Sequence, residues 1–120
     1  MTQPFSAIAD EKVVEFTRKQ SDEQLLSRSA HYRAWTMRGN EAMQAGEYDR
    51  AIALYYHAIK LGRDKPSAWE RRGDALVKKG EYQAALEAYN EAMNFASQQK
   101  PQLQKKMETA REKLAQELSY

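Results

Sequence analysis

The chain has 120 residues, 19 Lys and Arg against 17 Asp and Glu, and a formal net charge of +2, which suits one small domain without a polybasic surface. The absence of cysteine excludes disulfides, thiolate metal sites and thiol catalysis. Few glycines and prolines (5 and 3) favour helices. There is no apolar run long enough to cross a membrane and no recognisable secretory leader, so we expect a cytoplasmic protein.

The N-terminal segment, residues 1–31, is expected to be helical. Phe5, Ile8, Val13 and Phe16 share one helical face, which predicts a helix from about residue 5 to residue 19. Ser21 and Gln24 have the spacing of a capping box, which predicts a second helix starting near residue 22. We expect the segment to act as a cap; a dimer contact and a docking arm are the alternatives.

Two consecutive segments, 32–65 and 66–99, repeat one pattern with a period of about 34 residues. Ten positions are identical in the two copies. Most of them are Trp, Gly, Tyr and Ala, whose sizes place strict demands on packing. The pairs are Ala34/Ala68, Trp35/Trp69, Arg38/Arg72, Gly39/Gly73, Gly46/Gly80, Glu47/Glu81, Tyr48/Tyr82, Ala51/Ala85, Tyr55/Tyr89 and Ala58/Ala92.

Each copy is expected to form a helix, a turn and a second helix. Apolar residues recur at helical spacing on both sides of a single glycine, Gly46 or Gly80, which we expect to end the first helix in a left-handed conformation. Gly39 and Gly73 would let two helices approach closely. We expect the small residues Ala51 and Ala85 to allow the same close approach on the facing helices. We expect the Trp and Tyr residues to fill the space between the helices.

The pattern of these residues resembles the tetratricopeptide repeat (TPR) family, whose repeat unit has Trp, Gly, Ala, an aromatic residue and Ala at matching places. Arg38 and Arg72 stand where that pattern has Leu, and Arg63 and Ser97 where it has Pro. The resemblance implies an all-α fold: a right-handed α-solenoid of two helix-turn-helix repeats with flanking helices.

The C-terminal segment, residues 100–120, is expected to be a capping helix. Leu103, Met107, Ala110, Leu114 and Leu118 form one stripe, and the other side is charged. We expect the stripe to cover the second repeat, because a solenoid of two repeats leaves its ends apolar.

The sequence offers no support for enzymatic chemistry. His31 and His57 lack metal-ligand spacing, and there is no glycine-rich phosphate loop or nucleophile–base pattern. We therefore expect no enzyme activity, cofactor, metal or small-molecule substrate. Three basic doublets, Arg71/Arg72, Lys78/Lys79 and Lys105/Lys106, are interleaved with acidic residues, so nucleic-acid binding is a minor alternative.

The resemblance implies that the first helix of each unit lines a concave groove that holds a segment of a partner protein. The expected groove residues are Arg33, Thr36, Met37, Asn40, Gln44, Glu70, Arg71, Asp74, Lys78 and Lys105. Chaperone-tail binding through a carboxylate clamp is not expected, because Thr36, Arg71 and Pro101 replace three of its five residues.

The function expected from the sequence is therefore protein–protein interaction, as an adaptor, assembly factor or small chaperone. A structural protein that self-associates through its flanking helices, giving a homodimer, is the main alternative.

Overall fold

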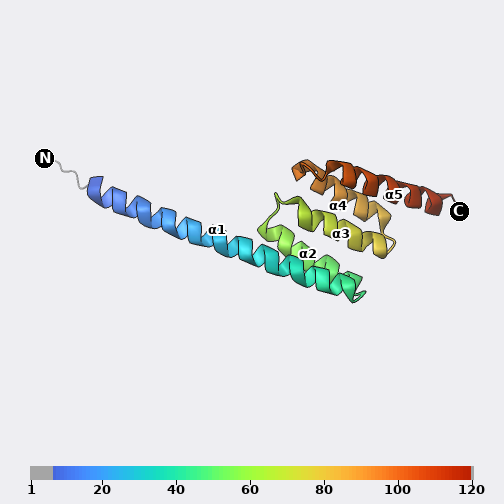
Figure 1. Ribbon diagram of the computed structural model, residues 1–120, viewed down its shortest axis with the longest axis horizontal. Helices are drawn as coiled ribbons and strands as arrows, with labels where there is room; N and C mark the ends of the chain where they lie inside the picture. The colour runs from blue at the N-terminus through green and yellow to red at the C-terminus, as the bar shows by residue number, and fades with distance from the viewer. Residues whose placement is uncertain (1–6, 120) are drawn as a thin grey trace.

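The computed structural model describes residues 7–119, which fold into five α-helices and form no strand. They are α1 (Ala7–Gln44), α2 (Tyr48–Leu61), α3 (Pro66–Lys78), α4 (Tyr82–Phe95) and α5 (Lys100–Leu118). Each helix packs against the next along the chain, so α2 to α5 and the second half of α1 form one stack (Figure 1). The molecule is elongated, 82 × 27 × 22 Å, because α1 extends far beyond this stack.

α1 is one uninterrupted helix of 38 residues, whereas the sequence pattern predicted a break near Ser21. That prediction was wrong. A capping box requires a non-helical residue at the cap, but neither glycine nor proline occurs between residues 5 and 38 to stop the helix. Serine inside a helix costs only a few tenths of a kcal/mol. Phe5, where the first helix was expected to start, lies outside the described residues.

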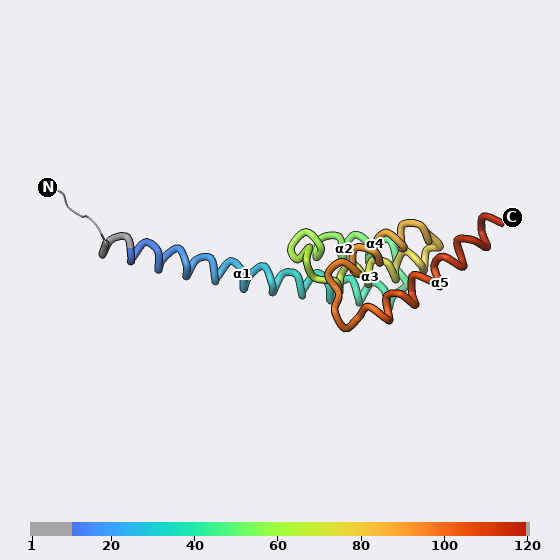
Figure 2. Tube along the Cα trace, turned by 90° about the horizontal axis from the view of Figure 1, so that it is seen from above, coloured from blue at the N-terminus to red at the C-terminus, as the bar shows by residue number. Residues whose placement is uncertain are grey.

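The first half of α1 does not cap the repeats, which corrects the first-choice expectation for this segment. Every residue from Glu11 to Arg28 is exposed, and the helix points away from the stack (Figure 2). Phe16, expected to be on an inward face, is 62% exposed. The alternatives of a dimer contact or a docking arm therefore remain.

The two repeats end their first helices as predicted. Gly46 and Gly80 are the only described residues with positive φ, at 76° and 81°. The Gly46 N–H donates to the Met43 carbonyl and the Glu47 N–H to the Ala42 carbonyl, and the same two hydrogen bonds recur around Gly80. These are the paired bonds of a Schellman motif, which satisfies carbonyls at the end of a helix.

Glycines and tyrosines form the tightest helix contacts. A methyl group on Gly73 would lie 2.5 Å from the Tyr89 ring, and Gly39 faces Tyr55 in the same way. Tyr55 and Tyr89 are fully buried, whereas Trp35 and Trp69 are half-buried. The tyrosines thus fill the space between the helices as expected, and the tryptophans do so only in part.

The small residues of the second helices are completely buried. Ala51 in α2 and Ala85 in α4 both have 0% exposure. Ala85 belongs to the core cluster that contains Tyr89, and Ala51 belongs to the cluster that contains Tyr55. Ala51 and Ala85 therefore act in packing alone, and neither is accessible to a partner.

α5 covers the second repeat as predicted. Leu103, Met107 and Ala110 are buried, and Leu103 and Met107 belong to the same core cluster as Leu76 and Tyr89. The cap ends before the helix does: Leu114 is half-buried and Leu118 is 78% exposed.

Candidate protein-interaction surface

The first helices of the repeats and the cap form one face, which we call the α1–α3–α5 face. α2 and α4 lie on the other side of the stack (Figure 2). This is the face for which the sequence predicted a groove.

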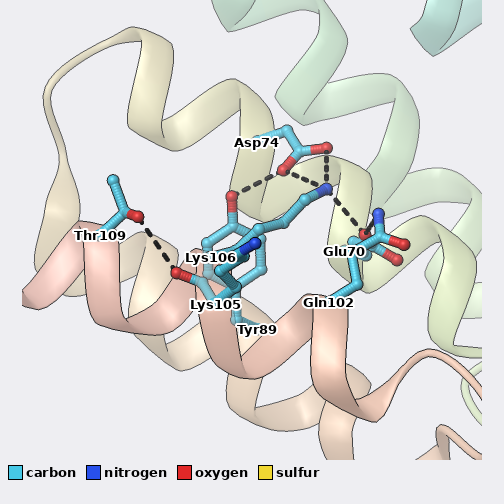
Figure 3. A network of polar contacts seen from close by, with 7 residues as sticks. All are labelled: Glu70, Asp74, Tyr89, Gln102, Lys105, Lys106 and Thr109. Carbon is cyan, nitrogen blue, oxygen red and sulfur yellow. Dashed lines mark hydrogen bonds and ion pairs between the residues drawn. The ribbon is translucent and has the colours of Figure 1, made fainter.

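A polar network joins α3, α4 and α5 on this face (Figure 3). The Lys106 ammonium lies 2.7 Å from Glu70 Oε2 and 3.0 Å from both carboxylate oxygens of Asp74. The Tyr89 hydroxyl donates to Asp74 Oδ1 at 2.6 Å, and the Gln102 amide donates to Glu70 at 3.1 Å. Both carboxylates that the sequence placed in the groove are therefore engaged by the protein's own side chains.

The network shifts the pKa values of its members. Burial raises the pKa of the Tyr89 hydroxyl, and the nearby Asp74 and Glu70 carboxylates raise it further. Burial lowers the pKa of Lys106, but hydrogen bonds to Glu70 and Asp74 outweigh that effect and raise it above the ordinary value. Lys106 is thus held as a cation and Tyr89 as a hydrogen-bond donor.

The first repeat has a simpler version of the same arrangement. The Tyr55 hydroxyl donates to Asn40 Oδ1 at 2.6 Å, one repeat unit before the Tyr89–Asp74 pair. Thr36 takes the place that Glu70 has in the second repeat. It is buried, and its hydroxyl donates to the Tyr32 carbonyl at 2.8 Å. Thr36 therefore does not face a groove, which corrects the prediction for this residue.

Each basic doublet contains one residue that the protein itself engages. Lys106 pairs with Glu70 and Asp74, Lys79 with Asp49 and Glu81, and Arg72 lies 5.5 Å from the centre of the Tyr56 ring. The other members are exposed and make no ion pair with any described residue: Arg71, Lys78 and Lys105.

A hollow of about 330 Å³ opens beside the network, between α3 and α5. Most of its exposed wall is apolar. The residues that line it are Val77, Tyr89, Gln102, Lys105, Lys106, Thr109 and Ala110.

A larger hollow, of about 610 Å³, lies between α2 and α4. Its cations already contact aromatic rings: Lys60 and Arg72 lie over Tyr56, and Arg63 lies over Trp69. Glu87 and Glu91 also line it. Its charges are therefore mixed and largely engaged.

The predicted groove residues fall into three groups. Arg33, Met37, Gln44, Arg71, Lys78 and Lys105 are exposed. Asn40, Glu70 and Asp74 are half-buried and hydrogen-bonded within the protein, and Thr36 is buried. Lys106 and Gln102 were not among the groove residues predicted from the sequence. Lys106 stands one repeat unit after Arg72, where the family pattern has Leu, so its place in the repeat could have shown that it faces the preceding unit.

The residues that define the repeat build the fold and stay separate from this face. Six of them are buried, namely Gly39, Ala51, Tyr55, Gly73, Ala85 and Tyr89. The other four are half-buried, namely Trp35, Tyr48, Trp69 and Tyr82. Of the ten, Tyr89 alone also lines the hollow between α3 and α5.

The described residues provide no group of three or more His, Cys, Asp or Glu that could hold a metal ion. Among them, no helix is long and apolar enough to span a membrane.

Comparison with known proteins agrees with this geometry. The tetratricopeptide repeat family profile matches residues 36–101. The TPR domain of Arabidopsis OM64 superposes with a TM-score of 0.69 at 22% sequence identity, over 74% of this chain and 73% of that one. No curated protein sequence matches the chain significantly. With more than half of its length matched, the chain belongs to the tetratricopeptide repeat family, and its fold is that of a protein-interaction module.

Proposed function

We propose that the α1–α3–α5 face binds a short acidic segment of a partner protein and that the module serves as an adaptor or assembly factor. The observation that carries this proposal is the pairing of both Glu70 and Asp74 with Lys106, which leaves these three side chains with only one net negative charge. The sequence suggests a mixture of charges on this face, but the charges that remain available to a ligand are mainly cations.

The exposed cations support an acidic ligand. Arg71 and Lys105 occupy the same position in successive units, so they project from neighbouring helices on one face. Lys78 lies on the same side of α3, two turns beyond Arg71. Glu70 and Asp74 are already paired with Lys106, and of the carboxylates near these cations Glu108 stays exposed without an ion pair to a described residue. The exposed cations therefore gain most from carboxylates supplied by a ligand.

The hollow beside Lys105 favours a ligand segment that contains one apolar residue. Its walls at Val77 and Ala110 are apolar, and its volume is large enough to take one large apolar side chain. Burial of that side chain would add affinity that does not depend on salt.

The size of the face limits the segment. The face is only three helices wide, α1, α3 and α5, so a short extended segment is enough to cross it.

Fluorescence anisotropy with a labelled peptide of Glu and Asp around one central Leu tests the proposal. We expect saturable binding that weakens as salt is added, because the contacts are exposed charge pairs. Arg71→Glu combined with Lys78→Glu should reduce affinity at least about tenfold. Replacing the central Leu by Ser should weaken binding of the same peptide by wild type.

Arg50→Glu combined with Lys60→Glu is the matched control, because it makes the same change in net charge on exposed residues of α2. It should leave the affinity nearly unchanged. Equal losses in both double variants, or equal binding of a peptide with Lys in place of Glu and Asp, would contradict the proposal. Tighter binding of single-stranded RNA than of the acidic peptide would favour nucleic acid instead.

A further inference from the structure

Residues 11–30 of α1, which we call the arm, form a helix that the rest of the described chain leaves uncovered except at its end, where Lys65 donates a hydrogen bond to Ser29. Only Ser29 among them is even half-buried. The exposed residues include large apolar side chains, with Phe16 at 62% and Leu26 at 72% exposure. An exposed helix of this length gains little stability from its own hydrogen bonds, so a packing partner would stabilise it.

One stripe of the arm has the spacing of a coiled-coil seam. It consists of residues separated alternately by four and three positions, which lie on one side of a helix. All of its members are exposed: Lys12, Phe16, Lys19, Glu23, Leu26 and Ala30. The stripe lies on the side of α1 opposite Tyr32 and Gly39, which pack within the first repeat.

The stripe is complementary to itself when it is reversed. In an antiparallel pair centred on residue 21, Phe16 of one helix lies level with Leu26 of the other. Lys19 then lies level with Glu23, and Lys12 with Ala30. Phe16 thus meets Leu26, the two central layers join opposite charges, and at the ends of the stripe Lys12 meets the small Ala30.

We propose that a second copy of this chain packs antiparallel against the arm along this stripe. A parallel pair would place Lys19 against Lys19 and Glu23 against Glu23, which is repulsive. A shift of one heptad would separate Phe16 from Leu26. Charged residues within a seam select orientation and register at some cost in stability, so we expect a specific, reversible dimer.

This dimer would enlarge the α1–α3–α5 face. The stripe continues along α1 through Arg33, Met37 and Gln44, which are exposed on that face. In the proposed register, Ala7 of one copy lies level with Trp35 of the other, so each arm would reach the edge of its partner's face.

Sedimentation equilibrium of the full chain tests the pairing through charge reversal. Lys19→Glu alone and Glu23→Lys alone each place like charges in both central layers. Each should therefore raise the dimer dissociation constant about tenfold or more. An equimolar mixture of the two variants should regain a dimer, because every central layer then joins Glu with Lys. The double variant Lys19→Glu/Glu23→Lys should also dimerise like wild type.

Arg18→Glu is the matched control, since it makes the same change in charge as Lys19→Glu on an adjacent exposed residue that lies outside the stripe and its flanking positions. It should change the dissociation constant by no more than about twofold. Circular dichroism should be the same for all these variants, because the residues contact no repeat.

Introduced cysteines test the orientation, since the chain has none of its own. A mixture of Lys12→Cys and Ala30→Cys should form a covalent dimer on mild oxidation, and neither variant should do so alone. Cross-linking of Lys12→Cys to itself would indicate a parallel pair and overturn the proposal. The proposal would also be overturned if the wild-type chain stays monomeric or if the mixture of charge variants does not associate. The stripe would then be a contact for a different protein.

Discussion

The Tyr89 hydroxyl donates a hydrogen bond of 2.6 Å to the Asp74 carboxylate, and Tyr55 repeats this contact with Asn40 at the same distance one repeat unit earlier. The two repeat units therefore share this polar contact as well as an apolar core. Only the second copy adds charge, because Asp74 also binds Lys106 of the cap.

Removing the two hydroxyls should have unequal effects. Tyr89→Phe takes a donor from a carboxylate and should lower the free energy of unfolding by about 2 kcal/mol, whereas Tyr55→Phe takes one from a neutral amide and should cost about 1 kcal/mol. Urea denaturation of the two variants measures the difference. Equal losses of unfolding free energy in the two variants would mean that Lys106 compensates fully for the hydrogen bond that Asp74 loses.

The two lysines of the last doublet should separate stability from binding. Lys106→Met leaves Glu70 and Asp74 without their cation and should destabilise the chain by about 1 to 2 kcal/mol. It should also weaken binding of the acidic peptide, because two unpaired carboxylates then face the ligand. Lys105→Met should leave the melting temperature nearly unchanged and weaken only the binding. A fully stable Lys106→Met variant would argue against a structural role for the network.

Gly73→Ala should destabilise the chain although alanine is the better helix former. The added methyl group would lie 2.5 Å from the Tyr89 ring, and overpacking of this kind costs about 1 to 3 kcal/mol. Thermal unfolding checks the loss. Repeating the substitution in a Tyr89→Leu background isolates the contact. If Gly73→Ala lowers stability as much in the Tyr89→Leu background as in wild type, the Tyr89 ring does not cause the loss.

The cap should depend on Leu103 and not on Leu118. Leu103 is fully buried against the second repeat, so Leu103→Ala should cost about 3 kcal/mol. Leu118 is exposed, so Leu118→Ala should change stability by less than about 0.5 kcal/mol. Chemical denaturation of both variants provides the comparison. Similar small effects would show that α5 is dispensable for the repeats.

Stability should fall in alkaline solution. Burial raises the pKa of Tyr32, Tyr55 and Tyr89 above 10.0, and carboxylate contacts raise that of Lys106 above 10.5 despite its burial. Above about pH 10 the unfolded chain releases protons that the folded chain retains, so the free energy of unfolding decreases as pH rises. Urea titrations at increasing pH measure this slope. Tyr89→Phe should make it shallower, and an unchanged slope would exclude Tyr89 as a contributor.

Local patterns explain which structural predictions succeeded. Gly46 and Gly80 end helices because glycine adopts a left-handed backbone readily, and Leu103 and Met107 are buried because helical spacing places them on one side. The break expected at Ser21 failed for a related reason: a capping signal is weak without a residue that interrupts the helix.

The sequence by itself determined the repeat, the glycines that end its first helices and the apolar side of the cap, because each depends on spacing within about one helix. Only the tertiary structure decided which groove charges are engaged internally and that the arm is exposed. These features depend on which side chains meet across helices, such as Lys106 with residues 32 and 36 positions before it. Alternating charges look alike along a sequence, and only packing brings a particular lysine to a particular carboxylate.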